Sequence, residues 1–131
     1  MRSRLIILTL LVGLVLVLSA CGGSAQSTPT PTPAPVQITF TTDPNPPATG
    51  PIEMIITVVD RQGQPITGAN VDVIADHTKM GGMTMHGVAT HQGDGRYAIT
   101  ANYGMSGKWL VTVQVKTGEL DYRQDIDLQV K

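Results

Sequence analysis

Apolar residues recur at every second position through most of the chain after residue 35, and this spacing limits the fold more than any other feature. Alternation of this kind gives a β-strand one apolar and one polar face, whereas a helix needs apolar residues three and four positions apart. The pattern is clearest in residues 120–130, where apolar side chains alternate with Asp, Arg and Gln. We therefore predict an all-β domain.

The apolar alternation divides into short segments that are separated by turn residues. Asp94-Gly95 and the stretch 60–65, which contains Gly63 and Pro65, are typical turn sequences. The predicted strands are residues 36–41, 52–58, 71–75, 84–90, 97–101, 109–115 and 120–130. About seven short strands in 96 residues predict a single immunoglobulin-like two-sheet antiparallel sandwich over residues 36–131.

The last predicted strand carries acidic residues on its polar face, at Asp121, Asp125 and Asp127. Carboxylates so arranged could suggest calcium. We interpret them instead as the solvated side of an edge strand, where charge blocks association between sheet edges.

The N-terminus has the order of an export signal. Arg2 and Arg4 precede an apolar run over residues 5–18, and the small residues Ser19 and Ala20 follow it. The run has 14 residues, whereas a membrane-spanning helix needs roughly 20. We predict a cleaved lipoprotein signal peptide over residues 1–20 rather than a permanent transmembrane helix.

Cys21 is the only cysteine, and it ends the sequence Leu18-Ser19-Ala20-Cys21. This sequence resembles the lipobox of bacterial lipoproteins, in which the cysteine is acylated and becomes the mature N-terminus. The resemblance implies a lipid anchor at Cys21 and a location on the extracytoplasmic side of the cell membrane. Residues 21–35 are rich in Pro, Thr and Ser, and we predict an extended linker there. A single cysteine also excludes an intramolecular disulfide.

Several functional classes lack support in the sequence. The formal net charge is −1, and no basic patch with interleaved aromatic residues is present, so we expect no nucleic-acid partner. The three histidines have no nucleophile elbow, phosphate-binding loop or HExxH motif around them. We expect a protein that is not an enzyme.

Methionine and histidine are concentrated in one short stretch. Met80, Met83 and Met85 lie within the ten residues from His77 to His86. Thioether sulfur is a soft ligand that selects Cu(I), and imidazole also suits copper. The candidate ligands are Met80, Met83, Met85, His86, His91 and Met105, with His77 a weaker candidate.

Two readings of these residues stay open. On a strand, Met83, Met85 and His91 would share one face and His86 would lie on the other. The methionines could equally fill the core at the end of the sandwich, and packing is the better account of Met54.

Three segments together resemble the YtkA-like (FixH-related) domain: Met80-Gly-Gly-Met83-Thr-Met85, Gly95-Arg-Tyr97 and Met105-Ser-Gly107-Lys-Trp109. The resemblance covers roughly residues 36–117. It implies an immunoglobulin-like sandwich in an extracytoplasmic, often lipid-anchored protein, and it links the chain loosely to copper handling and to the assembly of respiratory oxidases. The histidines do not map onto the family's pattern.

We therefore expect a lipid-anchored module that binds or delivers copper, with Cu(I) preferred, and whose partner is a copper-dependent oxidase or a copper-transport protein. The alternative is a protein-interaction or structural module of the envelope that binds no metal.

Overall fold

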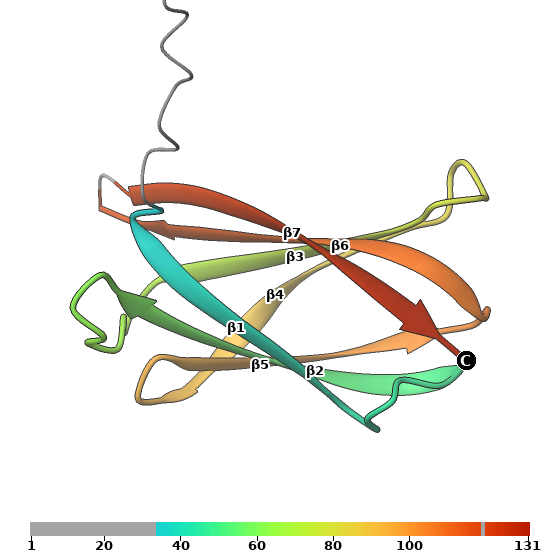
Figure 1. Cartoon of the computed structure of the whole chain (residues 1–131), viewed down its shortest axis with the longest axis horizontal. Coiled ribbons are helices and arrows are strands. Elements are labelled where there is room, and N and C mark those ends of the chain that lie inside the picture. The colour runs from blue at the N-terminus through green and yellow to red at the C-terminus, as the bar shows by residue number, and fades with distance from the viewer. Residues whose placement is uncertain (1–33, 119) are drawn as a thin grey trace, which may run out of the picture. The chain divides into compact units, whose positions relative to one another are not determined.

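Seven antiparallel strands follow one another in the computed structural model, which describes residues 34–118 and 120–131 (Figure 1). They are β1 Val36–Asp43, β2 Gly50–Asp60, β3 Asn70–His77, β4 Thr84–Gly93, β5 Arg96–Tyr103, β6 Gly107–Thr117 and β7 Leu120–Val130. The predicted all-β fold is confirmed. Among these residues no helix is long and apolar enough to cross a membrane. The predicted signal peptide, Cys21 and most of the linker lie outside the described residues.

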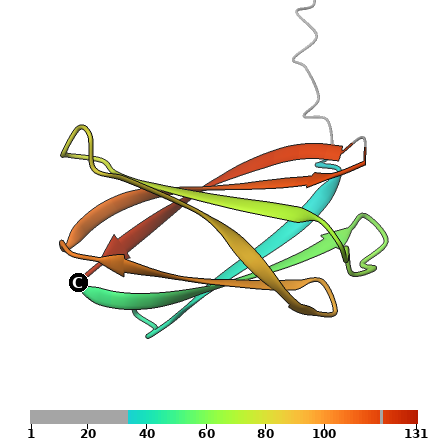
Figure 2. The ribbon, with the colours of Figure 1, turned by 180° about the vertical axis from the view of Figure 1, so that it is seen from behind.

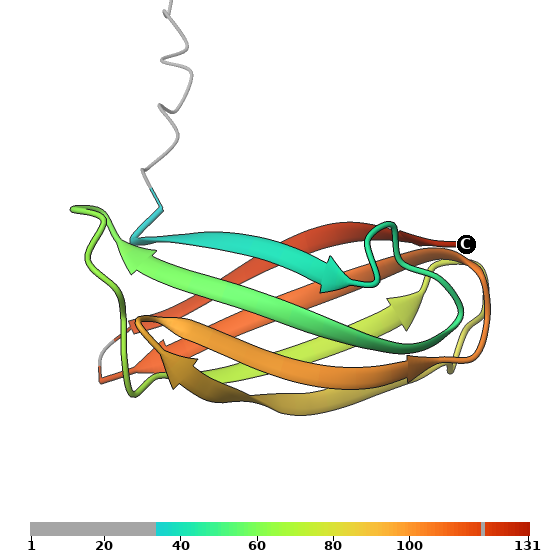
Figure 3. The ribbon, with the colours of Figure 1, turned by 90° about the horizontal axis from the view of Figure 1, so that it is seen from below.

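The strand order is β1-β2-β5-β4-β3-β6-β7. Strands β1, β2 and β5 form one layer with the end of β4, and strands β3, β6 and β7 form the other, which is the arrangement of an immunoglobulin-type sandwich. The layers are joined through β4, which pairs with β3 over residues 84–89 and with β5 only over residues 90–93. Figures 2 and 3 show the two layers from behind and from below, and in Figure 2 β4 passes from one layer to the other.

The core lies between the two layers and takes alternate residues from the strands. Its largest fully buried side chains are Trp109, Tyr97 and Tyr103, surrounded by branched aliphatic residues from β2, β3 and β6. Tyr97 also fixes the connection between β2 and β3, because its hydroxyl donates to the Ile66 carbonyl at 2.8 Å and accepts from the Ala69 amide at 3.1 Å. The hydroxyl therefore joins the start of β5 to a loop far away in the sequence.

The strand β7 lies at one edge of the sheet, as its charged face predicts. Its aspartates contact the neighbouring strand β6. Asp125 accepts from Thr112 at 2.7 Å, and Asp121 accepts from Gln114 at 2.6 Å. The acidic face is thus part of the contact between the two strands.

Removal of the Tyr97 hydroxyl tests its role in the fold. We expect Tyr97→Phe to lower the free energy of unfolding by about 1–3 kcal/mol, because the Ile66 carbonyl and the Ala69 amide each lose a partner in a partly buried place. Urea denaturation measures the change. Tyr122→Phe, which alters a half-buried ring on β7, is the matched control and should shift stability by less than about 0.5 kcal/mol. Equal effects of the two changes would contradict this role.

Candidate metal-binding site

Two turns meet at one end of the domain and carry three of the candidate methionines. The β3–β4 turn, residues 78–83, contains Met80 and Met83, and the β5–β6 turn, residues 104–106, contains Met105. They lie at the same end because His77, the last residue of β3, pairs with Trp109 near the start of β6. We call this the methionine end; Figure 1 shows both turns on its right side. Met80 is 44% exposed, whereas Met83 and Met105 are partly buried against the core.

His77 connects the two turns and is itself buried. Its backbone amide donates to the Met83 carbonyl at 3.1 Å, and its ring Nε2 donates to the Ser106 carbonyl at 3.4 Å. Its Nδ1 accepts from the Lys79 amide at 3.2 Å. Because Nδ1 accepts, we assign the proton of the neutral ring to Nε2. Both ring nitrogens are therefore engaged in holding the turns.

The segment Met105-Ser-Gly107-Lys-Trp109 has a structural explanation. Trp109 is 1% exposed, and its indole Nε1 donates to the Met105 carbonyl at 3.2 Å. Gly107 has φ +129°, and a Cβ there would lie 2.8 Å from Nε2 of His77. Only glycine suits this backbone conformation and this close approach. The motif thus shapes the β5–β6 turn beside the His77 ring.

A row of aromatic rings in edge-to-face contact extends from this turn to Met54. The Trp109 ring meets His77 edge-on, with a centroid distance of 5.0 Å, and meets Tyr103 in the same manner at 4.9 Å. The Tyr103 hydroxyl donates to the sulfur of Met54 at 3.2 Å. Burial raises the pKa of Tyr103 to about 12, so the phenol remains a donor even in alkaline solution.

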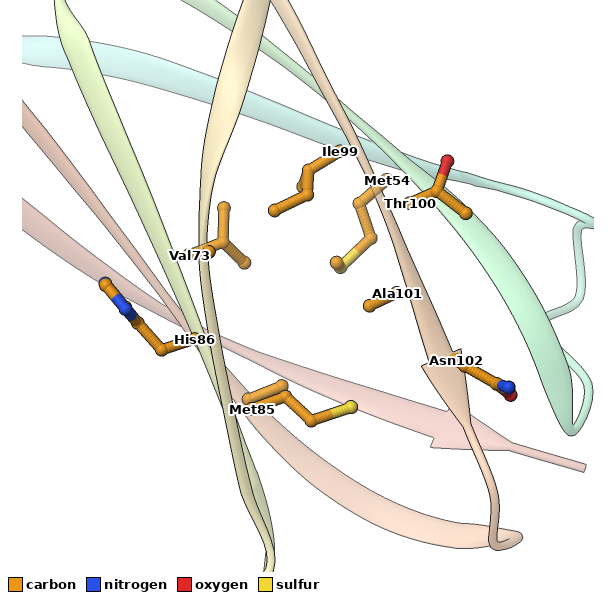
Figure 4. Close-up of a pocket in the computed structure, with 10 residues that line it drawn as sticks. Met54, Val73, Met85, His86, Ile99, Thr100, Ala101 and Asn102 are labelled. Atoms are coloured by element: carbon orange, nitrogen blue, oxygen red, sulfur yellow. The ribbon is translucent and has the colours of Figure 1, made fainter.

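A pocket of about 290 Å³ opens where β4 and β5 separate. Met54, Val73, Ala75, Met85, Ile99 and Ala101 provide most of its apolar lining. In Figure 4 the side chains of Met54 and Met85 extend toward the pocket, whereas His86 points away from it. The apolar sequence of β2 predicts packing alone for Met54, because nothing in this strand indicates either a hydrogen bond to sulfur or a neighbouring pocket.

The structure does not bring His86 and His91 to the methionine end. His86 lies on the outer face of β4, with Nε2 3.6 Å from the carboxylate of Asp72. His91 pairs with Tyr97, and their ring centroids are 5.1 Å apart. Tyr97 precedes Tyr103 by six residues on β5, which is about 20 Å of strand. Among the described residues, no group of three or more His, Cys, Asp or Glu side chains could hold a metal ion.

The comparisons identify the family. The sequence model of the YtkA-like family matches residues 30–114, so the chain belongs to the YtkA-like family. A search of the curated proteins and a search of the solved structures found no significant match.

Substitution of Gly107 tests whether the β5–β6 turn requires the close approach of this residue to the His77 ring. We expect Gly107→Ala to destabilise the domain by about 1–3 kcal/mol, because the new Cβ meets the His77 ring and the positive φ is strained. Thermal unfolding measures the loss. Gly104→Ala in the same turn is the control, since a Cβ there meets nothing within 4 Å. If Gly107→Ala were as stable as Gly104→Ala, the close approach of His77 would not matter to the fold.

Proposed function

We propose that this protein is a lipid-anchored extracytoplasmic module that binds Cu(I) through methionine thioethers and delivers it to a partner. The observation that carries the proposal is the placement of Met80, Met83 and Met105 on two turns at one end of the domain, which His77 connects. These residues are separated in the sequence by up to 25 positions, yet they share one end of the domain.

The chemistry of this end favours a soft monovalent metal. Thioether sulfur prefers Cu(I) over harder cations, and its lone pairs are not protonated at ordinary pH. Met80 is 44% exposed, and Met83 and Met105 are partly buried. A site at the surface suits exchange of the metal with a second protein, since a partner's ligands can replace the methionines one at a time.

The proposed ligand set is narrower than the sequence suggested. Met80, Met83 and Met105 are its members. Met85 faces the pocket instead, and His86 lies on the outer face of β4. His91 packs on Tyr97, which lies about 20 Å along β5 from Tyr103 and the methionine end. Both ring nitrogens of His77 are engaged in hydrogen bonds within the fold. Thioethers alone therefore form the proposed site.

The proposed anchor places this site outside the cytoplasm. Acylation of Cys21 would attach the chain to the membrane, and stable attachment needs more than one acyl chain. The Pro-rich linker over residues 21–35 would let the domain reach above the membrane surface. A copper-dependent oxidase or a copper-transport protein would be the partner.

Cu(I) titration of the full chain in detergent, against a competing chelator, tests the metal site. The variant Met80→Leu/Met83→Leu/Met105→Leu keeps side-chain volume nearly constant and should bind Cu(I) at the turns at least tenfold more weakly, about 1.4 kcal/mol. The variant His86→Ala/His91→Ala should bind as the unmodified protein does. Equal affinity of the methionine variant and the unmodified protein would overturn this ligand set, and an unmodified protein that binds no Cu(I) would favour a protein-interaction module without metal.

Replacement of the cysteine tests the anchor. We expect Cys21→Ser to abolish acylation, so that the chain is either left with its signal peptide or released from the membrane. Mass spectrometry of the N-terminus and membrane fractionation measure the outcome. A processed, unacylated Cys21→Ser chain that stays in the membrane fraction would contradict the anchor.

A further inference from the structure

The pocket between β4 and β5 is a consequence of the way β4 changes layers. The two strands pair only over residues 90–93 of β4 and 96–98 of β5. Beyond that point β4 follows β3 and β5 follows β2, so the strands diverge toward the methionine end. The pocket of about 290 Å³ lies in the opening between them.

Small residues keep this opening from being filled. Ala75 on β3 and Ala101 on β5 line the pocket. At Gly87 on β4 the space beside the backbone is taken by Ile99, whose Cδ1 would lie 2.5 Å from an added Cβ, so only Ala75 and Ala101 leave room in the pocket. Protein interiors are normally packed to the density of organic crystals. A pocket of this size beside the core therefore leaves room for a bound group.

The sulfur of Met54 is held in place at the buried wall of this pocket. Met54 is 1% exposed, and its sulfur accepts the hydrogen bond from Tyr103 at 3.2 Å. A thioether sulfur has two lone pairs, and the phenol occupies only one of them. The second lone pair is available to a metal, while the hydrogen bond fixes the position of the sulfur.

Met85 provides a second sulfur from the facing strand. It is half-buried on the inner face of β4 and pairs with Ala75. Figure 4 shows the side chains of Met54 and Met85 entering the same pocket from different strands. Two thioethers from two strands thus lie at one opening.

The rest of the lining selects against harder cations. None of the residues that line the pocket is a carboxylate or a lysine, and its polar members Thr100 and Asn102 are neutral. The imidazole of His86 points away from the pocket and toward Asp72. An apolar pocket penalises a divalent ion strongly, whereas soft sulfur ligands favour Cu(I).

We propose that Met54 and Met85 form a second, interior Cu(I) site in the pocket between β4 and β5. The proposal rests on the proposed Cu(I) function and extends it from the turns to the interior of the sandwich. The metal would be held by two sulfurs, which leaves a coordination position open to a methionine of the turns or of a partner. Cu(I) would move between the sites by ligand exchange, without a change of oxidation state.

Methionine methyl NMR of the full chain in detergent tests this site directly. The protein is labelled with ¹³C at the methionine methyl groups and titrated with Cu(I) under anaerobic conditions, and the resonances are assigned with single Met→Leu variants. We expect the methyl signals of Met54 and Met85 to shift together. In Met54→Leu, which conserves side-chain volume, Met85 should no longer shift, while Met80, Met83 and Met105 should respond as before.

The outcomes separate this proposal from the one for the turns. Shifts confined to Met80, Met83 and Met105 would overturn the interior site and leave the proposed function intact. Shifts confined to Met54 and Met85 would support the interior site and refute the ligand set at the turns. If no methionine methyl shifts, both proposals fail. Unchanged signals of Met80 and Met105 in metal-free Met54→Leu would show that the variant is folded.

The number of Cu(I) ions bound after removal of the turn methionines gives a second, independent measurement. The variant Met80→Leu/Met83→Leu/Met105→Leu should retain one Cu(I), and that Cu(I) should disappear when Met85→Leu is added. Trp109 is the only tryptophan and makes an edge-to-face contact with Tyr103, the donor to Met54. Its fluorescence should therefore change when the retained Cu(I) binds. Retention of that Cu(I) after Met85→Leu would contradict the interior site.

Discussion

The structure of the methionine end depends on the packing of Trp109 between the rings of His77 and Tyr103. Its indole donates to the Met105 carbonyl, and the rings of His77 and Tyr103 contact it edge-to-face at centroid distances of 5.0 and 4.9 Å. The backbone amide of His77 in turn donates to the Met83 carbonyl of the β3–β4 turn, and the Tyr103 hydroxyl donates to the sulfur of Met54. One buried aromatic residue thereby positions groups on three strands, β2, β3 and β5, and on both turns. Its aromatic neighbours add to the area that it buries.

Much of the fold follows from local sequence. Strands such as Leu120–Val130 and Asn70–His77 alternate strictly, because each has one face in the core. Turn residues mark the ends of the strands, and charge on Asp121 and Asp125 marks an edge. The change of layers by β4 was not predictable in the same way. Its pairing with β3 and then with β5 depends on contacts between distant segments, and alternation within β4 is the same in either layer.

The candidate site was only partly predictable for the same reason. Alternation correctly gives Met85 and His86 opposite faces of β4. Alternation does not reveal which turns lie at the same end of the domain. The separation of His91 from the methionine end was therefore not predictable. The contact of His77 with Gly107 needs the register between β3 and β6. The apolar strand around Met54 predicts packing alone, and the hydrogen bond from Tyr103 depends on contacts between β2 and β5 that the sequence does not reveal.

The central claim is that methionine sulfur, and not imidazole, binds Cu(I) in this protein. X-ray absorption at the copper edge of the Cu(I)-loaded full chain tests it most directly, because the spectrum distinguishes sulfur from nitrogen neighbours and detects imidazole rings. The account predicts copper surrounded by sulfur alone, and the same spectrum for the variant His86→Ala/His91→Ala. Nitrogen neighbours with the scattering pattern of imidazole would contradict it.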